Sequence, residues 1–305
     1  MLGKFFVLVV AATIMCLAAF WVLTIPGTVP ASALPPYTPN LANGRVMFFA
    51  GGCASCHATP GHEDRTQLGG GVGMKSRFGT FYAPNISPDQ NDGIGQWTEA
   101  QFVTAMVKGT SPDGRHYFPE FPYASYQRMR YEDVRDLFAH LKTLPAVQGR
   151  IRDHDVRFPF NIRRAVGGWK LLFLDGETFR PDPSKDAEWN RGAYLVNGPG
   201  HCVECHSPRN SLGGIVSGQR YAGGATPDGK DFVPNITQHE LSSWSVEDLI
   251  KLLETGENRD NDTVGGDMGK VVSNTKQLSD ADRKAMAVYV KWLPPVEGPR
   301  RPEQK

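Results

Sequence analysis

Four of the five cysteines in this sequence stand in two short motifs that have the same spacing. Each motif reads Cys-x-x-Cys-His, formed by Cys53, Cys56 and His57 in the first copy and by Cys202, Cys205 and His206 in the second. On one helical turn, two sulfur atoms three positions apart reach the two vinyl groups of a haem, and the next side chain presents its imidazole to the iron. The motifs therefore predict two covalently bound haems c, with His57 and His206 as axial ligands.

Other uses of paired cysteines fit this pattern less well. A zinc site built from two cysteine pairs needs them roughly 15–20 residues apart, whereas Cys53 and Cys202 are 149 positions apart. A thioredoxin-like site needs a βαβ context, which the sequence does not show. A structural disulfide does not explain why a histidine follows both pairs.

The sequence around the motifs repeats with a period of about 150 residues. The matching segments are Pro84-Asn85-Ile86 and Pro234-Asn235-Ile236, Trp97-Thr98 and Trp244-Ser245, and Leu144-Pro145 and Leu293-Pro294. A repeat of this length indicates two similar domains. We expect the first domain at residues 38–147 and the second at residues 188–296.

Helical patterns position the motifs in both repeats. Segments with helical spacing of apolar residues or with capping residues are 41–50, 98–108, 131–143, 189–197, 245–255 and 279–292. Thr98 and Gln101 form a capping-box pattern, and Gly109 and Gly256 stand where helix C-caps are expected. The predicted fold class is all-α, and the 33 glycines and 23 prolines predict long loops between short helices.

A second axial ligand is expected from the loop before the last helix of each repeat. Histidine with methionine is the usual pair for electron-transfer haems, because a thioether ligand raises the reduction potential. In the second repeat we expect Met268 in its glycine-rich loop, rather than Met286 at core spacing in the last helix. In the first repeat we expect Met129. His116, or an iron with an open position, stays as the alternative.

The N-terminal residues 1–33 predict a membrane anchor or a signal peptide. Residues 5–25 carry no charge and are long enough to cross a bilayer as a helix. Lys4 on the N-terminal side favours an orientation with the rest of the chain in the periplasm. Residues 31–33 (ASA) have the form of a cleavage site, but the apolar run is longer than signal peptides usually have. We favour a single anchor in a bacterial inner membrane, with a soluble periplasmic protein as the alternative.

The stretch between the repeats, residues 148–187, is too apolar for a flexible linker. We expect an ordered strap that packs on both domains. The alternative is a membrane-lying segment, because Arg163, Arg164 and Lys170 flank the apolar residues. Residues 297–305 form a tail. The formal net charge of +1, without a long basic run, argues against a nucleic-acid partner.

Two stretches beside the motifs are specific enough to carry a family resemblance. They are residues 78–89 (FGTFYAPNISPD), continued by Gly93-Ile-Gly95 and Trp97, and residues 190–195 (NRGAYL), continued through the second motif to Asn210. These stretches resemble the cytochrome c subunits of bacterial membrane-bound dehydrogenases for alcohol, gluconate, fructose or aldehyde. The resemblance covers about residues 40–296 and implies two tandem class I cytochrome c domains with redox protein partners.

Two departures from that family matter. Its members typically carry three haem motifs, whereas this chain has two. They typically have Met-Pro-Tyr where this chain has Phe121-Pro-Tyr123. Related diheme cytochromes with Phe-Pro-Tyr tend to offer a methionine a few residues on, as Met129 does. The resemblance does not identify the partner dehydrogenase.

Motifs and resemblance together predict a periplasmic diheme protein that relays electrons. The expected donor is a dehydrogenase subunit, and the expected acceptor is an oxidase, another cytochrome or a quinone-linked enzyme. The alternative is a diheme enzyme of the peroxidase or thiosulfate dehydrogenase type, which needs an open or labile iron at the first haem. A haem-based sensor is disfavoured because the chain has no output module.

Overall fold

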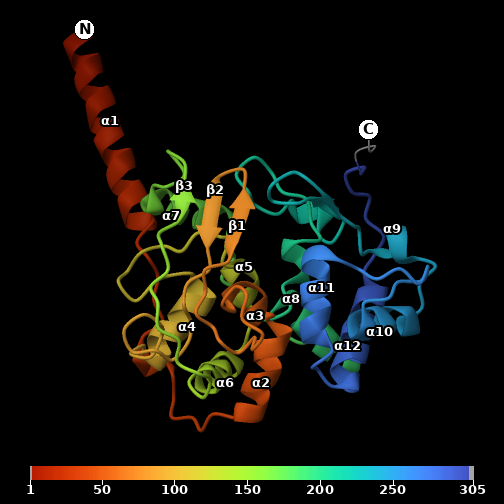
Figure 1. Ribbon diagram of the computed structural model, residues 1–305. Helices are drawn as coiled ribbons and strands as arrows, with labels where there is room; N and C mark the ends of the chain where they lie inside the picture. Colours follow the sequence, from red (N-terminus) through yellow and green to blue (C-terminus); the bar gives the residue numbers. More distant parts are fainter. Residues whose placement is uncertain (1, 302–305) are drawn as a thin grey trace.

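The computed structural model describes residues 2–301 and shows a mostly helical protein with one long helix projecting from its body (Figure 1). The body consists of two groups of helices, one on either side of the connecting residues 148–187 in the sequence. Of the predicted tail, residues 302–305 lie outside the described part of the chain.

The first helical group surrounds the first cysteine motif. Its helices are α2 (Leu41–Ala50), α3 (Cys53–His57), α4 (Glu99–Lys108), α5 (Tyr123–Tyr126) and α6 (Tyr131–Leu141). The two long helices α2 and α6 cross at Gly44, where a Cβ atom would lie 2.1 Å from the carbonyl oxygen of Asp136. Only glycine allows the two backbones to approach this closely.

The second helical group repeats this arrangement around the second motif. Its helices are α8 (Ala187–Asn197), α9 (Gln238–Leu241), α10 (Val246–Thr255), α11 (Gly266–Thr275) and α12 (Asp280–Trp292), with the short 3₁₀ turns η2 (Cys202–Glu204) and η3 (Ser217–Gln219). α8 and α12 cross at Gly192, where a Cβ atom would lie 1.9 Å from the carbonyl oxygen of Ala285. Gly192 therefore has the same role in this group as Gly44 has in the first.

The predicted starts and ends of the two middle helices are confirmed. Thr98 begins α4 with a capping box, and Ser245 does the same for α10. Gly109 and Gly256 end these helices in the left-handed conformation, with φ of 57° and 83°. Local capping chemistry thus marks both ends of each helix.

The all-α prediction is confirmed only in part, because the loops contain short strands. They are β1 (Gly73–Ser76), β2 (Gly79–Tyr82), β3 (Asp155–Val156), β4 (Gly224–Ala225) and β5 (Phe232–Val233). β1 and β2 form a hairpin after the first motif, β3 joins its edge from the connecting segment, and β4 pairs with β5. Strands of two to four residues are too short to leave an alternating pattern in the sequence.

The segment around Met268 is helical, although its glycines predict a loop. α11 begins at Gly266, and the carboxylate of Asp267 in its first turn pairs with Lys270 at 2.7 Å. An acidic side chain is favourable at a helix N-terminus, and α11 also buries Val272. These contributions outweigh the low helix propensity of glycine.

The connecting segment contains α7 (Arg163–Phe173), which touches both helical groups. Lys170 Nζ donates to two carbonyl oxygens at the end of α4, at 2.6 and 2.7 Å. Trp169 Nε1 donates to the carbonyl oxygen of Leu212, beyond the second motif, at 3.1 Å. α7 therefore contacts residues on both sides of the connecting segment.

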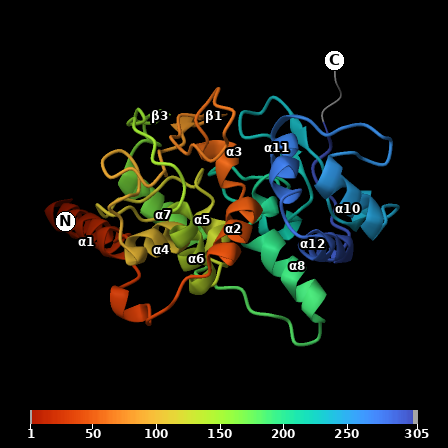
Figure 2. The ribbon, with the colours of Figure 1, turned by 60° about the horizontal axis from the view of Figure 1, so that its bottom comes forward.

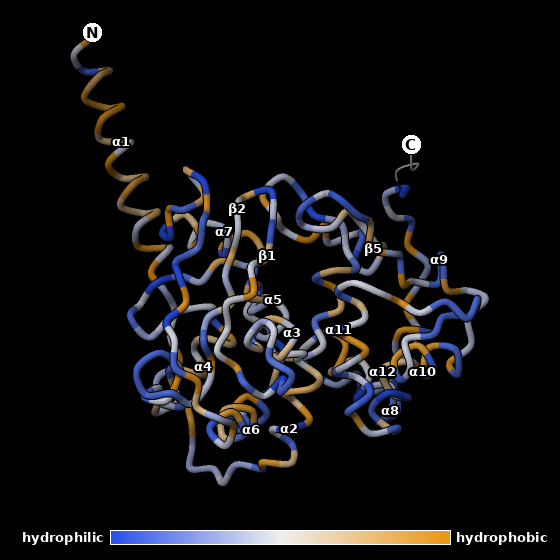
Figure 3. The backbone as a smooth tube through the Cα atoms, in the orientation of Figure 1, coloured by the Kyte–Doolittle hydropathy of each residue, from blue (hydrophilic) through white to orange (hydrophobic). Residues whose placement is uncertain are grey.

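The projecting helix α1 (Leu2–Leu23) is long and apolar enough to cross a membrane, and none of its described residues is buried (Figure 3). The chain directly after it is built into the body. Thr24 is buried, and its backbone carbonyl oxygen accepts a hydrogen bond from His116 Nε2 at 2.9 Å. The N–H of Val29 donates to Thr104 Oγ1, also at 2.9 Å. We call this attachment of residues 24–29 to the first helical group the anchor joint.

One apolar core extends through both helical groups. Its buried side chains come from α2 and α6 in the first group and from α8 and α12 in the second, among them Phe48, Leu137, Leu195 and Met286. Figure 2 shows the same two sets of helices on either side of the body. A shared core ties the stability of one group to that of the other.

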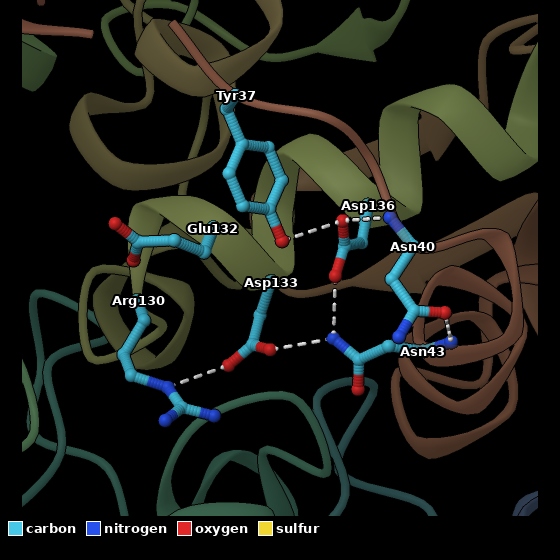
Figure 4. A pocket seen from close by; sticks show the side chains of 7 residues that line it. All are labelled: Tyr37, Asn40, Asn43, Arg130, Glu132, Asp133 and Asp136. Atoms are coloured by element: carbon cyan, nitrogen blue, oxygen red, sulfur yellow. Dashed lines mark hydrogen bonds and ion pairs between the residues drawn. The ribbon is translucent and has the colours of Figure 1, made fainter. Parts of the chain in front are cut away.

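A polar pocket of about 400 Å³ borders this core beside α6 (Figure 4). Asp133 accepts hydrogen bonds from Arg130 Nε at 2.9 Å, from Asn43 Nδ2 at 2.7 Å and from the hydroxyl of Tyr194 on α8. Asp136 accepts from Asn43 Nδ2 at 2.8 Å. The buried carboxylates are thus partnered, and the pocket is a structural network that links α6 to α2 and α8.

Candidate haem-binding sites

The first motif is positioned by the end of α2. Asn40 caps the start of this helix, where its Oδ1 accepts from the N–H of Asn43 at 3.1 Å. Gly51 follows the last residue, and Gly52 adopts a left-handed φ of 56° that turns the chain into α3. α3 is a single turn formed by residues 53–57, so its two sulfur atoms, three positions apart, lie on one face.

The second motif follows α8 through the same kind of turn. His201 stands 149 positions after Gly52 and is also left-handed, with φ of 39°. This conformation costs a non-glycine residue roughly 1–2 kcal/mol, so the turn is imposed by its surroundings. His201 Nδ1 lies 2.7 Å from the carbonyl oxygen of Pro199, and its ring packs 5.5 Å from the ring of Tyr126. His201 is therefore a packing residue beside the motif.

The two motif histidines have equivalent hydrogen-bond partners. His57 Nδ1 lies 2.8 Å from the carbonyl oxygen of Pro84, and His206 Nδ1 lies 2.8 Å from that of Pro234. A carbonyl oxygen only accepts, so Nδ1 carries the proton and Nε2 keeps its lone pair for an iron. Burial lowers the pKa of both imidazoles, which favours the neutral form that binds a metal.

The repeated Pro-Asn-Ile sequence holds these carbonyl groups in place. Asn85 Nδ2 donates to the carbonyl oxygen of Val147 at 2.7 Å, and Asn235 Nδ2 donates to that of Val296 at 2.8 Å. The Pro-Asn-Ile repeat is visible in the sequence, but its role in orienting the histidines is not. The acceptor is a backbone carbonyl group, which every residue has, so no residue type signals it.

The four motif cysteines have the state that covalent haem attachment requires. None is in a disulfide. Burial raises the pKa of Cys53 and Cys202 to about 12, so these two thiols are neutral. Within residues 2–301, no group of three or more His, Cys, Asp or Glu side chains is placed to hold a metal ion. Two thiols and one imidazole in each motif are the donor set that fits a haem held by two thioethers and one histidine.

Met268, expected as the distal ligand of the second haem, lies in the first turn of α11 and is partly buried. α11 packs on α10 of its own group and on α2 and α3 of the first group. The sulfur donor is thus carried by a helix at the boundary between the two groups.

Met129 and His116, the donors considered for the first haem, lie in different surroundings. Met129 is almost fully buried, and its Cγ lies 3.7 Å from the position of a Cβ on Gly198, at the end of α8. His116 faces the anchor joint, where its Nε2 bonds to the carbonyl of Thr24. That bond competes with ligation of an iron. Met129 stands two residues before α6, as Leu278 stands two residues before α12.

The two groups differ at the position that carries the methionine in the second group. Isolated β-bridges end at His116 in the first group and at Thr263 in the second. Five residues later stand Phe121 in the first group and Met268 in the second. A phenyl ring has no lone pair, so Phe121 offers no ligand at the position equivalent to Met268.

Reciprocal hydrogen bonds link each motif to the opposite helical group. Ser55, inside the first motif, accepts from Nδ2 of Asn274 on α11 at 3.0 Å. Ser125 on α5 donates to Oε1 of Glu204, inside the second motif, at 2.6 Å. Ser55 and Glu204 are 149 positions apart, and so are Ser125 and Asn274. The two contacts are therefore related by the internal repeat and bring both motifs to one interface.

A charged cluster lies at the same interface. Arg209 pairs with the nearly buried Glu204 at 2.6 Å. Burial raises the pKa of Glu120 to about 7, with Arg209 opposing and Glu204 adding to the shift. Besides the larger effect of desolvation, the negative charge of Glu120 adds to the rise in the pKa of Cys56 and of Cys205, so this carboxyl lies near both motifs. The sequence gives no signal for Glu120, because only the fold brings it to the interface.

Comparisons with known proteins show which proteins this chain resembles. The cytochrome c family model matches residues 41–145. A diheme cytochrome c-type protein of Cereibacter sphaeroides is 47% identical over 262 residues, which cover 85% of this chain and 88% of the relative. The fructose dehydrogenase cytochrome subunit of Gluconobacter japonicus is 36% identical over 272 residues, 87% of this chain but 54% of the relative. One of the nicotinate dehydrogenase subunits of Pseudomonas putida is 41% identical over 255 residues, 83% of this chain and 21% of the relative.

Proposed function

Because this chain belongs to the family of diheme c-type cytochromes, which includes cytochrome subunits of dehydrogenases, we propose that it relays electrons from a dehydrogenase subunit to a respiratory acceptor. It carries two covalently bound haems c. The proposed acceptor is an oxidase or another cytochrome. The chain spans about half of the fructose dehydrogenase relative and a fifth of the nicotinate dehydrogenase relative. A dehydrogenase subunit as the partner of this chain is therefore part of the proposal.

The two reciprocal contacts, each between one motif and the opposite helical group, carry this proposal. Each bound haem supplies a one-electron iron couple, and the Ser55–Asn274 and Ser125–Glu204 bonds hold the two attachment sites at one interface. The protein then needs no acid–base pair, because it only fixes the sites, tunes them and excludes water. The carbonyls bonded to His57 and His206 make these imidazoles more basic ligands.

For the distal ligands we propose Met268 at the second haem and Met129 at the first. Both are sulfur donors in the segment between the middle and last helices of their groups. A thioether would favour ferrous iron and raise the potential of each haem. Met129 occupies the position of Leu278 in the second group, and not the position of Met268. The first haem is therefore the more demanding test of this assignment.

We propose that the helical groups are tandem cytochrome c domains at residues 38–147 and 188–296, joined by a strap at residues 148–187. The equivalent crossing glycines Gly44 and Gly192 and the equivalent histidine–proline bonds support this division. The contacts of α7 with both groups support the role of a strap.

We further propose that α1 stays attached and anchors the domains on the periplasmic face of a bacterial inner membrane. Cleavage after Ala33 would remove two parts of the anchor joint, the buried Thr24 and the Val29–Thr104 hydrogen bond. Lys4, at the start of α1, supports an N-terminus on the cytoplasmic side.

The mass of the purified protein tests the central claim. We expect two covalent haems that survive denaturation, and a redox titration with two one-electron transitions. The double change Cys202→Ser with Cys205→Ser should leave one covalent haem and one transition. Cys16→Ser, a change in the exposed cysteine of α1, should keep both. A single haem in the unchanged protein would refute the relay.

A further inference from the structure

Large apolar side chains are exposed close to the foot of α1. They belong to α7 and to the turn before it, and we call them the apolar rim: Phe158, Phe160, Ile162, Leu171 and Leu172. Their exposed fractions run from 45% at Ile162 to 79% at Phe158. Exposed apolar residues scattered singly are normal, but a cluster of this kind marks a surface that binds something.

α7 places part of this rim in line with the membrane-spanning helix. Arg164 donates to the carbonyl oxygen of Trp21 and stacks on its ring, with the guanidinium carbon 4.1 Å from the ring centroid. One turn later, a Cβ on Gly168 would lie 3.1 Å from the ring of Phe20. Residues 171 and 172 follow on the same helical face, seven and eight positions after Arg164. The row of α7 that contacts α1 therefore ends in two exposed leucines.

The opposite face of α7 is occupied by the protein. Val166 and Lys170 are buried, and Lys170 bonds to the end of α4. Leu171 and Leu172 are 55% and 67% exposed. α7 is thus an amphipathic helix with a fixed inner face and a free apolar outer face.

The charges of the segment suit a lipid surface. Residues 157–174 contain no acidic residue, whereas Arg157, Arg163 and Arg164 accompany the apolar side chains. Basic residues next to large apolar ones are typical of helices that lie in the headgroup region of a bilayer, where phosphates attract the cations. Trp21 adds an aromatic ring at the end of α1, where interfacial tryptophans are common.

The position of the rim favours lipid over a protein partner. Figure 1 shows α7 and β3 at the foot of α1. At 1.5 Å per residue, the 22 residues of α1 measure roughly 33 Å, about the thickness of the hydrocarbon core. With α1 in a bilayer, the foot of the helix lies at the headgroups. A protein that covered the rim would have to occupy the headgroup layer itself.

We propose that α7 and residues 158–162 lie in the headgroup layer of the bilayer that α1 spans, with the apolar rim inserted at the acyl boundary. This inference rests on the proposed membrane placement of α1. The rim adds a second contact beside the helix, so the first helical group cannot swing around α1.

Spin labels on the complete haem protein in vesicles of phosphatidylcholine and phosphatidylglycerol test this inference. The native Cys16 reports whether α1 is inserted. Leu172→Cys, in a protein that also carries Cys16→Ser, reports on the rim. Leu41→Cys with Cys16→Ser is the matched control, because Leu41 is a leucine of α2 that is 49% exposed. Collision rates of each label with oxygen and with a water-soluble nickel chelate measure its immersion.

We expect the oxygen-to-nickel ratio at residue 172 to exceed that at residue 41 by at least about fivefold, as for side chains at the acyl boundary. A label at Phe158→Cys should give the same result if the change at residue 172 disturbs folding. A water-exposed label at Cys16 would refute the membrane placement of α1. An immersed Cys16 with water-exposed labels at residues 172 and 158 would refute the rim alone.

Discussion

The carbonyl groups of Pro84 and Pro234 decide which nitrogen of each motif histidine is available. They hold the proton on Nδ1 of His57 and His206 and leave Nε2 free. The sequence identifies both histidines from motif spacing alone. Their orientation depends on backbone atoms 27 and 28 residues away, which no residue pattern encodes.

At the second haem, Met268→Ala should give a high-spin iron at neutral pH, because the sulfur ligand is lost. The measurement is the weak charge-transfer band that reports iron–sulfur ligation. Met286→Ala is the control, since Met286 is buried in α12 at core spacing. That variant should lose stability and keep the band. A Met268→Ala protein with an unchanged spectrum would show that another group ligates this iron.

At the first haem, Met129→Ala should open a coordination position. The ferrous variant is expected to bind carbon monoxide at one haem, with a lower potential there, because a thioether favours ferrous iron. His116→Ala should leave the ligation unchanged, since His116 Nε2 is engaged at the anchor joint. Carbon monoxide binding by the unchanged protein would mean that Met129 is not a firm ligand, and it would favour a diheme enzyme over the relay.

Glu120 should couple the haem potentials to pH. Burial raises its pKa to about 7, so it is protonated below that pH and ionised above it. The carboxylate that forms as pH rises favours ferric iron, so both potentials should fall as pH rises through about 7. The electrostatic effect is roughly 1 kcal/mol, or about 40 mV.

Potentiometric titrations from acid to mildly alkaline pH measure this coupling. Glu120→Gln should remove the step near pH 7, because the amide does not titrate. The exposed Glu177 provides the matched control, and Glu177→Gln should keep the step. A step that persists in Glu120→Gln would assign the proton to another group.

At the level of elements, capping residues and apolar spacing predict most of the long helices. α2 and α4 match residues 41–50 and 98–108 within one residue at each end. α11 is missed because its glycines suggest a loop, while the burial of residues such as Val272 against other helices stabilises it. Short strands such as β3 depend on pairing partners far away in the sequence.

The helix crossings depend on two glycines that no sequence motif singles out. Gly192→Ala should lower the free energy of unfolding by about 1–3 kcal/mol, because a methyl group at this crossing would overlap the carbonyl oxygen of Ala285. Gly44→Ala should behave alike at the crossing of α2 and α6. Denaturant unfolding of the haem-loaded proteins measures both changes.

Gly218→Ala is the control for these changes, since a Cβ at Gly218 meets no atom within 4 Å. Its unfolding free energy should differ little from that of the unchanged protein. Equal stability of the Gly192 and Gly218 variants would show that α8 and α12 can separate without cost.

At the scale of the whole molecule, the anchor joint predicts that the N-terminal segment is retained. The protein isolated from membranes should begin at its original N-terminus, because cleavage would remove Thr24 and Val29 from the first helical group. Intact mass spectrometry measures this directly. A mature chain that begins at Leu34 would contradict it. The sequence alone allows either a retained anchor or a cleaved signal peptide. Contacts between distant residues, such as that of Thr24 with His116, favour the retained anchor.

The anchor joint also determines how such a protein would meet its partners. A redox domain on a flexible tether samples a hemisphere of solution, and its encounters depend on the bulk concentration of the partner. With α1 placed in a bilayer as proposed, a helical group fixed at its foot by Thr24, His116 and Arg164 would stay at one height above that bilayer. Its search is then confined to two dimensions. Turnover should scale with the number of partner molecules per unit area of membrane.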